Sequence, residues 1–374
     1  MRTRLLPYLA LVTMLGFAIN GSAQPAKTQS QNSTSSNAVG KVVDVQGRVS
    51  MRRRAWTRFV PAFIGTLLLR GDKLRFEGSS RAKIVCADKT VHNLAGGEQV
   101  VPCQTQATGP PVIRYRGSII NKPRGSAAKL PIEVISPRNT KLLDSRPWLR
   151  WTPVPGETTY KVTVWGMDLN WQTEVSSKTE LRYPEEAPPL VAGETYKLTV
   201  TADGYSTDDE REPGLGFTVL NEQDVKTIRA AEKQIREMGL TDISTRLLIA
   251  DLYTSWGLRA DAIEYLESLA SALKEPSVYR SLGALYLEIG LGRRAEERYV
   301  EALELSQAND DLEGQAMAYQ ILASIQLDLG NVNEAIFRLK KAIESYGNLG
   351  DRANVKELKK EIARLARLRK STRS

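Results

Sequence analysis

The sequence predicts a multidomain protein in which two all-β modules precede an all-α array of helical repeats. The first observation is a series of short alternating apolar runs, broken by glycine and proline, between residues 38 and 220. The second is a change to helical periodicity at Asn221. The third is an internal repeat within 221–351, where three helix–turn–helix segments align. With 374 residues, 41% apolar and 25% charged, the chain is long enough for several folded modules.

The first residues, 1–23, have the three-part pattern of a secretory signal peptide. Arg2 and Arg4 precede an apolar run, and small residues at 21–23 suit cleavage. An uncleaved anchor is the alternative, for which the run is short. The polar residues 24–37 then read as a flexible tether. We expect an exported protein, periplasmic or at the cell surface, without an integral membrane span after cleavage.

Residues 38–103 predict a small β domain with tight turns. Its pattern consists of a hairpin at Gly47-Arg48-Val49, Gly65, the turn Gly71-Asp72-Lys73-Leu74 and a strand at Ala82–Cys86. These features resemble the FecR-type domain of bacterial envelope proteins. In the anti-sigma regulators of that family the domain follows a transmembrane helix, which the sequence lacks here. The resemblance therefore implies an envelope β module, with FecR-like signalling as an alternative.

Two candidate sites lie in this β domain. Cys86 and Cys103 have 16 residues between them, and an oxidising compartment favours a disulfide over two buried free thiols. Arg52, Arg53 and Arg54 form a candidate anion-binding patch, since guanidinium groups match phosphate and carboxylate geometry. A solvated loop is the alternative for the three arginines.

After a basic linker at 104–130, residues 131–220 predict a β-sandwich. Three motifs indicate the sandwich: Pro147-Trp148-Leu149-Arg150-Trp151, the alternating strand 160–164 and the later aromatic strand 193–198. They resemble the fibronectin type III group of immunoglobulin-like domains. This resemblance implies a spacer with Trp151 in its core.

Residues 221–374 contain the repeat and a closing amphipathic helix. The aligned columns place a small residue in each first helix and a glycine seven residues later: Ala250, Gly283 and Ala323, then Gly257, Gly290 and Gly330. The pattern resembles the tetratricopeptide repeat (TPR) family, with units at 244–275, 277–307 and 317–345. The third unit is displaced by an insertion around 307–313, which we expect to lengthen the flanking helices.

In the tetratricopeptide family, the first helix of each unit lines a concave surface that binds extended peptides or partner helices. Carried over by register, the partner-binding residues are Leu247, Asp251, Arg280, Leu287, Glu288, Gln320 and Asp328. Because this set is mixed in charge, the resemblance implies a basic or mixed peptide as the occupant.

Charge is unevenly distributed along the chain. Residues 1–130 hold 20 basic and 5 acidic residues, 131–220 hold 9 and 14, and 352–374 hold 9 and 2. Because we expect the protein to be exported, nucleic acid is not the expected partner of these basic ends. An anionic envelope polymer is the expected partner instead. Opposite charge on separate modules also permits self-association.

Motifs of catalysis are not found in the sequence. It has no phosphate-binding loop, no HExxH and no GxSxG, and its one histidine, His92, stands apart from the cysteines. We expect no enzyme activity, cofactor or metal. Trp165 and Trp171 are either packed or exposed for stacking on sugar rings.

These observations predict an exported adaptor that binds another protein through the helical groove. The rival prediction is an envelope-polymer or cell-surface binding protein that acts through the two β modules, with the repeats serving only to assemble it.

Overall fold

The computed structural model describes residues 38–103, 132–209 and 215–371. A β-rich part is followed by eight helices in this part of the chain. Three segments expected from the sequence lie outside the described residues: the signal peptide 1–23, the tether 24–37 and the linker 104–130.

The first β module is one antiparallel sheet with the strand order β3-β2-β5-β1-β4, and β6 pairs with β5. A register shift between Phe76 and Arg81 divides β5, so that its first half pairs with β2 and its second half with β1. Its strands are β1 (Ala38–Gln46), β2 (Val49–Arg52), β3 (Val60–Pro61), β4 (Leu67–Leu69), β5 (Lys73–Cys86) and β6 (Val91–Val100).

The second β module contains two sheets, ordered β11-β10-β13-β15-β8, with β14 on β13, and β12-β9-β7. Both contribute to one core, in which Trp151 is buried as predicted. Its strands are β7 (Val134–Ser136), β8 (Thr140–Leu142), β9 (Trp148–Trp151), β10 (Thr159–Trp165), β11 (Asn170–Ser176), β12 (Glu180–Arg182), β13 (Thr195–Ala202), β14 (Tyr205–Ser206) and β15 (Phe217–Val219).

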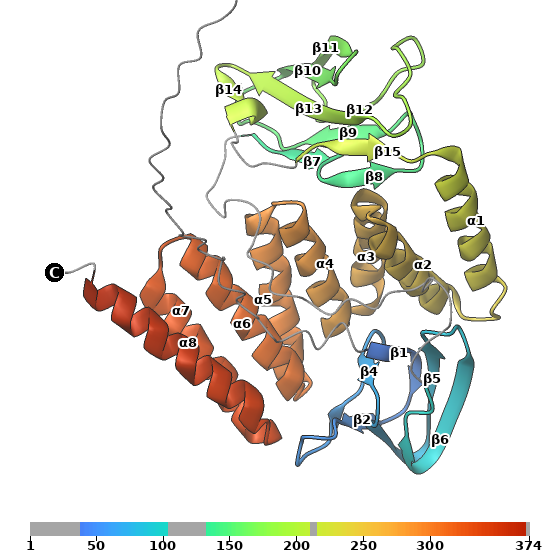
Figure 1. The fold of residues 1–374 in the computed structure, drawn as a ribbon, viewed down its shortest axis with the longest axis vertical. Helices are drawn as coiled ribbons and strands as arrows, with labels where there is room; N and C mark the ends of the chain where they lie inside the picture. Colours follow the sequence, from blue (N-terminus) through green and yellow to red (C-terminus); the bar gives the residue numbers. More distant parts are fainter. Residues whose placement is uncertain (1–37, 104–131, 210–214, 372–374) are drawn as a thin grey trace, which may run out of the picture. The chain divides into compact units, whose positions relative to one another are not determined.

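The helices form successive hairpins, α2 with α3, α4 with α5 and α6 with α7, followed by α8 (Figure 1). The helices that flank the insertion, α5 and α6, have 17 residues each and are longer than α2, α3 and α4, as predicted. The helices are α1 (Glu222–Arg236), α2 (Asp242–Trp256), α3 (Arg259–Leu273), α4 (Pro276–Glu288), α5 (Gly292–Ala308), α6 (Leu312–Asp328), α7 (Val332–Leu349) and α8 (Arg352–Ser371).

Glycine shapes these hairpins in two ways. Gly257, Gly290 and Gly330 have φ values of 79°, 79° and 77°, so each turn uses the left-handed conformation that ends helices. At Gly283, a Cβ atom would lie 2.6 Å from the ring of Tyr299, because α4 and α5 approach closely there. The small-residue column of the repeat therefore marks close helix contact.

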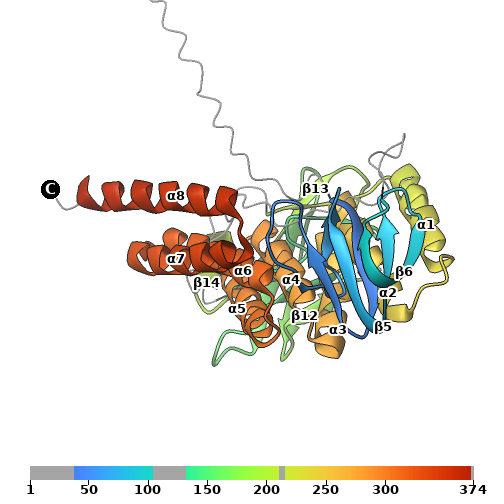
Figure 2. The ribbon, with the colours of Figure 1, turned by 90° about the horizontal axis from the view of Figure 1, so that it is seen from below.

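The last helix, α8, lies beside α7 (Figure 2). Leu358 and Leu365 on α8 are 6% and 5% exposed and join the core of the array. With Val355 and Ile362, which pack against the same cluster, they form an apolar stripe that repeats every three or four residues, the spacing of one helix face. The predicted closing amphipathic helix is thus present.

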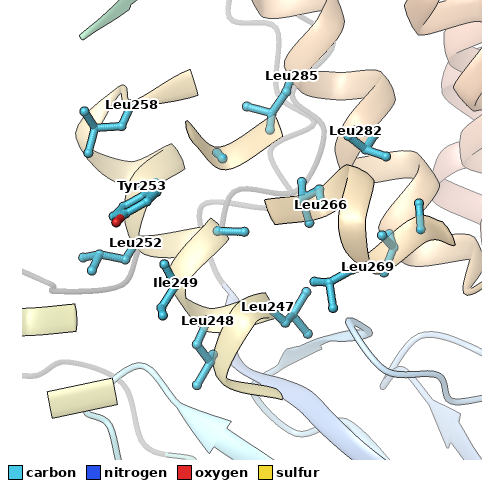
Figure 3. Packing of buried hydrophobic residues seen from close by; sticks show 14 of the residues in the cluster. Leu247, Leu248, Ile249, Leu252, Tyr253, Leu258, Leu266, Leu269, Leu282 and Leu285 are labelled. Carbon is cyan, nitrogen blue, oxygen red and sulfur yellow. The ribbon is translucent and has the colours of Figure 1, made fainter. Parts of the chain in front are cut away.

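The core of the array is continuous with the first β module. Figure 3 shows Leu247 of α2 beside Leu269 of α3 in one buried cluster. Val43 of β1 and Val85 of β5 belong to that same cluster, and both are fully buried. The first sheet therefore uses the array as part of its own core.

Candidate functional site

The predicted groove begins at α2, where the first β module is packed against it. Lys41 Nζ on β1 lies 2.6 Å from both carboxylate oxygens of Asp251 on α2. The two side chains are 5% and 18% exposed. Burial raises the pKa of Asp251, and the neighbouring Lys41 ammonium opposes that rise.

Two serine hydroxyls strengthen this contact. Ser244 Oγ on α2 donates to the Val43 carbonyl over 2.8 Å, and Ser277 Oγ on α4 donates to the Ile64 carbonyl. Both hydroxyls lie in the first turn of their helix. The β module thus satisfies its own buried carbonyl groups with donors at the starts of α2 and α4.

These contacts correct the expectation that Leu247 and Asp251 face a partner. Leu247 is 2% exposed and is enclosed by the shared core, so no external ligand reaches it. Asp251 is occupied by Lys41. The predicted partner-binding side of α2 is therefore used inside the chain, with Lys41 of the first β module at Asp251 and the shared core around Leu247.

The second unit also uses its predicted partner-binding residues internally. Arg280 Nη1 lies 3.1 Å from Asp311, and Glu288 accepts from Arg259 Nε over 2.7 Å. Leu287 is half-buried against the helical core. The structure therefore uses these side chains to join neighbouring helices.

The third unit differs from the first two. Gln320 Oε1 accepts a hydrogen bond from the Tyr346 hydroxyl over 2.7 Å and is half-buried. Asp328 is exposed at the end of α6. Leu329, the next residue, is 36% exposed, and Phe337 on α7 is 54% exposed. Apolar surface is thus available at the α6–α7 hairpin.

The triple arginine is split between buried and exposed positions. Arg53 lies 3.0 Å from Asp72 and 2.5 Å from Glu313 on α6, and its side chain is 13% exposed. Arg52 lies over the ring of Phe59, and Arg54 is exposed. The expectation of one anion-binding patch is therefore corrected at Arg53, whose charge is satisfied inside the protein.

The electrostatics of this buried cluster follow from its low exposure to solvent. Burial raises the pKa of Asp72 to about 6, although Arg53 acts in the opposite direction. Burial also raises the pKa of Glu313. Burial alone would lower the pKa of Arg53, but the two carboxylates raise it by more than burial lowers it. The pKa is therefore raised overall, and the guanidinium stays charged.

The start of α8 completes the series of contacts with the first β module. Trp56 Nε1 donates to Asp351 Oδ2 over 3.1 Å, and the Thr57 N–H donates to the Leu349 carbonyl over 3.0 Å. The module therefore contacts the starts of α2, α4, α6 and α8 in turn. These four helix starts lie on one edge of a helical-hairpin array.

The second β module binds at the opposite ends of the helices. The Arg138 guanidinium donates to the Ile289 carbonyl at the end of α4, and the Lys141 N–H donates to the Gly257 carbonyl at the end of α2. The last carbonyls of a helix lack intrahelical donors, and a cation suits that end of the helix dipole. Arg138 is 2% exposed, so this junction is dry.

The outer face of the sheet β11-β10-β13 is a second candidate surface. Trp165 is 45% exposed, and its Nε1 donates a hydrogen bond to Thr199 Oγ1 over 3.3 Å. The centroid of its ring lies 5.8 Å from Lys197 Nζ. A hollow of about 380 Å³ lies further along this face, lined by Thr159, Lys161, Glu174 and residues 201–206. Trp171, by contrast, packs edge-on against Tyr183 at 4.9 Å.

The cysteines and the histidine have structural surroundings. Cys86 and Cys103 form a disulfide that ties the end of β5 to the segment after β6. His92 Nε2 lies 3.1 Å from Thr90 Oγ1 on the surface. Among the residues that the structure describes, no group of three His, Cys, Asp or Glu is placed to hold a metal ion. None of the described helices is long and apolar enough to cross a membrane.

Sequence reasoning missed Lys41, Trp56 and Arg138 as the residues that join the modules. A lysine within the apolar run of β1 was an available signal, because buried charge requires a partner. The tryptophan two residues after the arginine run was another. Arg138 carried no such signal, since its carbonyl partners are set only by the fold.

No family model matches the chain, and no curated protein matches it. Solved structures similar to part of it include MamA, with 22% identity and a TM-score of 0.27 over 39% of this chain and 88% of that chain. BtubC from P. vanneervenii has 20% identity and a TM-score of 0.28 over 41% and 74%. A second MamA structure has 21% identity and a TM-score of 0.27 over 39% and 82%.

Proposed function

We propose that the chain is an exported adaptor that binds another protein and catalyses no reaction. The observation that carries the proposal is the unequal use of the three helical units. The first β module contacts the starts of α2, α4 and α6, and the second β module contacts the ends of α2 and α4. At the α6–α7 hairpin, by contrast, Leu329 and Phe337 are exposed. Exposed apolar side chains on a folded protein mark contact surfaces when they gather.

In this proposal the array is a frame as well as a binding element. The starts of the helices hold the first β module and the ends of α2 and α4 hold the second. A partner bound at the α6–α7 hairpin then has a fixed position relative to both modules. Such positioning is the property that distinguishes an adaptor from a single binding domain.

Export is supported by the disulfide. Disulfides persist in oxidising compartments and are rare in the cytosol. The absence of activity is supported by the use of the reactive groups: both cysteines are joined to each other, and Asp72 pairs with Arg53.

The test is site-specific photo-crosslinking in the exporting cell with the full-length chain. A crosslinking residue at Phe337 or Leu329 is expected to capture one defined protein, because these side chains face the partner. A crosslinker at the exposed Lys226 of α1 serves as the matched control. Equal labelling at all three positions, or none at Phe337 and Leu329, would overturn the proposal.

A second candidate function, binding of a neutral glycan polymer, is favoured by the outer face of the sandwich. Trp165 offers an aromatic platform, and the hollow beside Tyr205 adds hydroxyl and charged groups for hydrogen bonds. Trp165 and Lys161 lie on the same face of β10, about 13 Å apart at the rise of a strand. This span suits several linked sugar rings.

The matched control for this candidate is Trp148, which is 41% exposed on the other sheet. In sedimentation with purified cell-wall glycan, Trp165→Ala is expected to remove binding and Trp148→Ala to preserve it. If the wild-type chain stays in the supernatant, or if both variants behave alike, the glycan candidate fails.

A further inference from the structure

Helix α8 carries a row of cations on its solvent side. Arg352, Lys356, Lys359 and Arg367 are exposed and recur at the spacing of one helix face. Within the described residues none of these four forms an ion pair. Their neighbours on the helix differ, because Lys360 pairs with Glu357 and Arg364 pairs with Glu361.

The loop between β2 and β3 adds two more cations at the start of this row. Thr57 is hydrogen-bonded to Leu349, and Trp56 to Asp351, so the loop lies against the first turn of α8. Arg54 and Arg58 flank these anchoring residues and are exposed. Neither forms an ion pair in the part of the chain that the structure describes.

The acidic groups at this junction are already used. Glu313 and Asp72 pair with the buried Arg53. The Asp351 carboxylate accepts hydrogen bonds from Trp56 Nε1 and from the Asn354 N–H. The exposed surface that remains is therefore positive. We call it the basic surface, and its members are Arg54, Arg58, Arg352, Lys356, Lys359 and Arg367.

The shape of the basic surface limits the anions that fit it. The row on α8 alone runs about 22 Å at 1.5 Å per residue. Its cations stand on an exposed helix and an exposed loop and do not converge on one point. A single phosphate would contact only one or two of them, whereas a plane of phosphate headgroups contacts the whole row.

We propose that the basic surface docks the protein on a bilayer that contains anionic phospholipid. Guanidinium groups bind phosphate with two parallel hydrogen bonds, and clustered basic residues are drawn to the negative potential of such a membrane. The apolar side of α8 is committed to the array, where Leu358 and Leu365 are buried. The helix therefore binds at the headgroup level without inserting.

The experiment uses the full-length chain and vesicles of phosphatidylglycerol mixed with phosphatidylcholine, with pure phosphatidylcholine vesicles beside them. Flotation is expected to show binding to the anionic vesicles alone and release at high salt, because screening weakens exposed charge contacts. Lys356→Gln/Lys359→Gln is expected to lower vesicle affinity about tenfold or more, as each cation contributes separately. Arg54→Gln/Arg58→Gln is expected to do the same.

The control variant Lys226→Gln/Lys233→Gln on α1 changes the net charge equally, away from the basic surface, and is expected to bind normally. Circular dichroism and the melting temperature show that each variant is folded. Three outcomes overturn the proposal: equal binding by all variants, equal loss in the control, or failure to bind vesicles together with salt-sensitive binding of soluble polyphosphate. The last outcome would assign the surface to a phosphate polymer.

Discussion

Lys41 on β1 and Asp251 on α2 form a buried ion pair, with Nζ 2.6 Å from each carboxylate oxygen, across 210 positions of sequence. This pair fixes the first β module on the helical array. It also explains why the groove expected at α2 is closed: the position that would meet a partner's charge meets the chain's own lysine.

The Lys41–Asp251 pair predicts a large effect of single replacements. Asp251→Ala leaves a buried ammonium without this carboxylate, and we expect the free energy of unfolding in urea to fall by about 3–5 kcal/mol. The double variant Lys41→Met/Asp251→Leu is expected to recover most of that loss. As a control, Lys360→Ala removes an exposed ion pair with Glu357. It should change the free energy of unfolding by about 0.5 kcal/mol or less. An Asp251→Ala variant as stable as wild type would contradict this role.

Gly65 and Gly156 provide a test of the β module's contact with α4. Both have a φ of 89°, so alanine costs about 1 kcal/mol at each from backbone conformation. A Cβ atom at Gly65 would also lie 2.5 Å from Ser277 Oγ, whereas nothing lies within 4 Å at Gly156. We expect Gly65→Ala to lower the melting temperature clearly more than Gly156→Ala. Equal shifts would show that the contact with Ser277 contributes nothing.

Reduction of the disulfide is expected to destabilise the first β module. Cys86 and Cys103 are 17 positions apart, and closing such a loop is worth about 3 kcal/mol in the chain-entropy model. Thermal melts with and without reductant measure the difference. The double variant Cys86→Ala/Cys103→Ala should melt at the same temperature under both conditions, and a reductant effect on that variant would point to another cause.

Glu275, which precedes α4, predicts a pH dependence of stability. Burial raises its pKa to about 7, with Arg280 acting in the opposite direction. The folded carboxyl thus holds its proton where the unfolded one has lost it, so its contribution to stability declines as pH rises from about 4.5 to 7.

Glu275→Gln removes this dependence, because the amide stays neutral. Its stability relative to wild type should rise by about 2 kcal/mol across that pH window, measured by urea unfolding at several pH values. Glu222→Gln, at an 83% exposed position, should show no comparable trend. A constant difference between Glu275→Gln and wild type would refute the assignment.

Local features of the fold were predictable because they depend on nearby residues. The glycines at 257, 290 and 330 end their helices in the left-handed conformation, and Gly283 permits the contact with Tyr299. The insertion near residue 307 lengthens helices, and Trp151 is in the core. Turn chemistry and apolar spacing are written in short stretches of sequence, so they were readable without a structure.

The candidate site was less predictable, because exposure depends on what packs where. Register placed Leu247 and Asp251 on one side of α2, but the partner that covers this side comes from β1. Likewise, three adjacent arginines look alike in the sequence. The positions of Asp72 and of Glu313 on α6 separate the buried Arg53 from the exposed Arg54.

The sequence by itself determined the order of two β modules and a helical array, the repeat with its glycine turns, and the excess of basic residues at both ends. Tertiary structure alone decided that the first module fills the expected groove and that the basic loop at Arg54 meets the basic helix at Arg352. The physical reason is that local conformation follows from short-range sterics and spacing. Which charges are buried, paired or exposed follows from contacts between residues hundreds of positions apart.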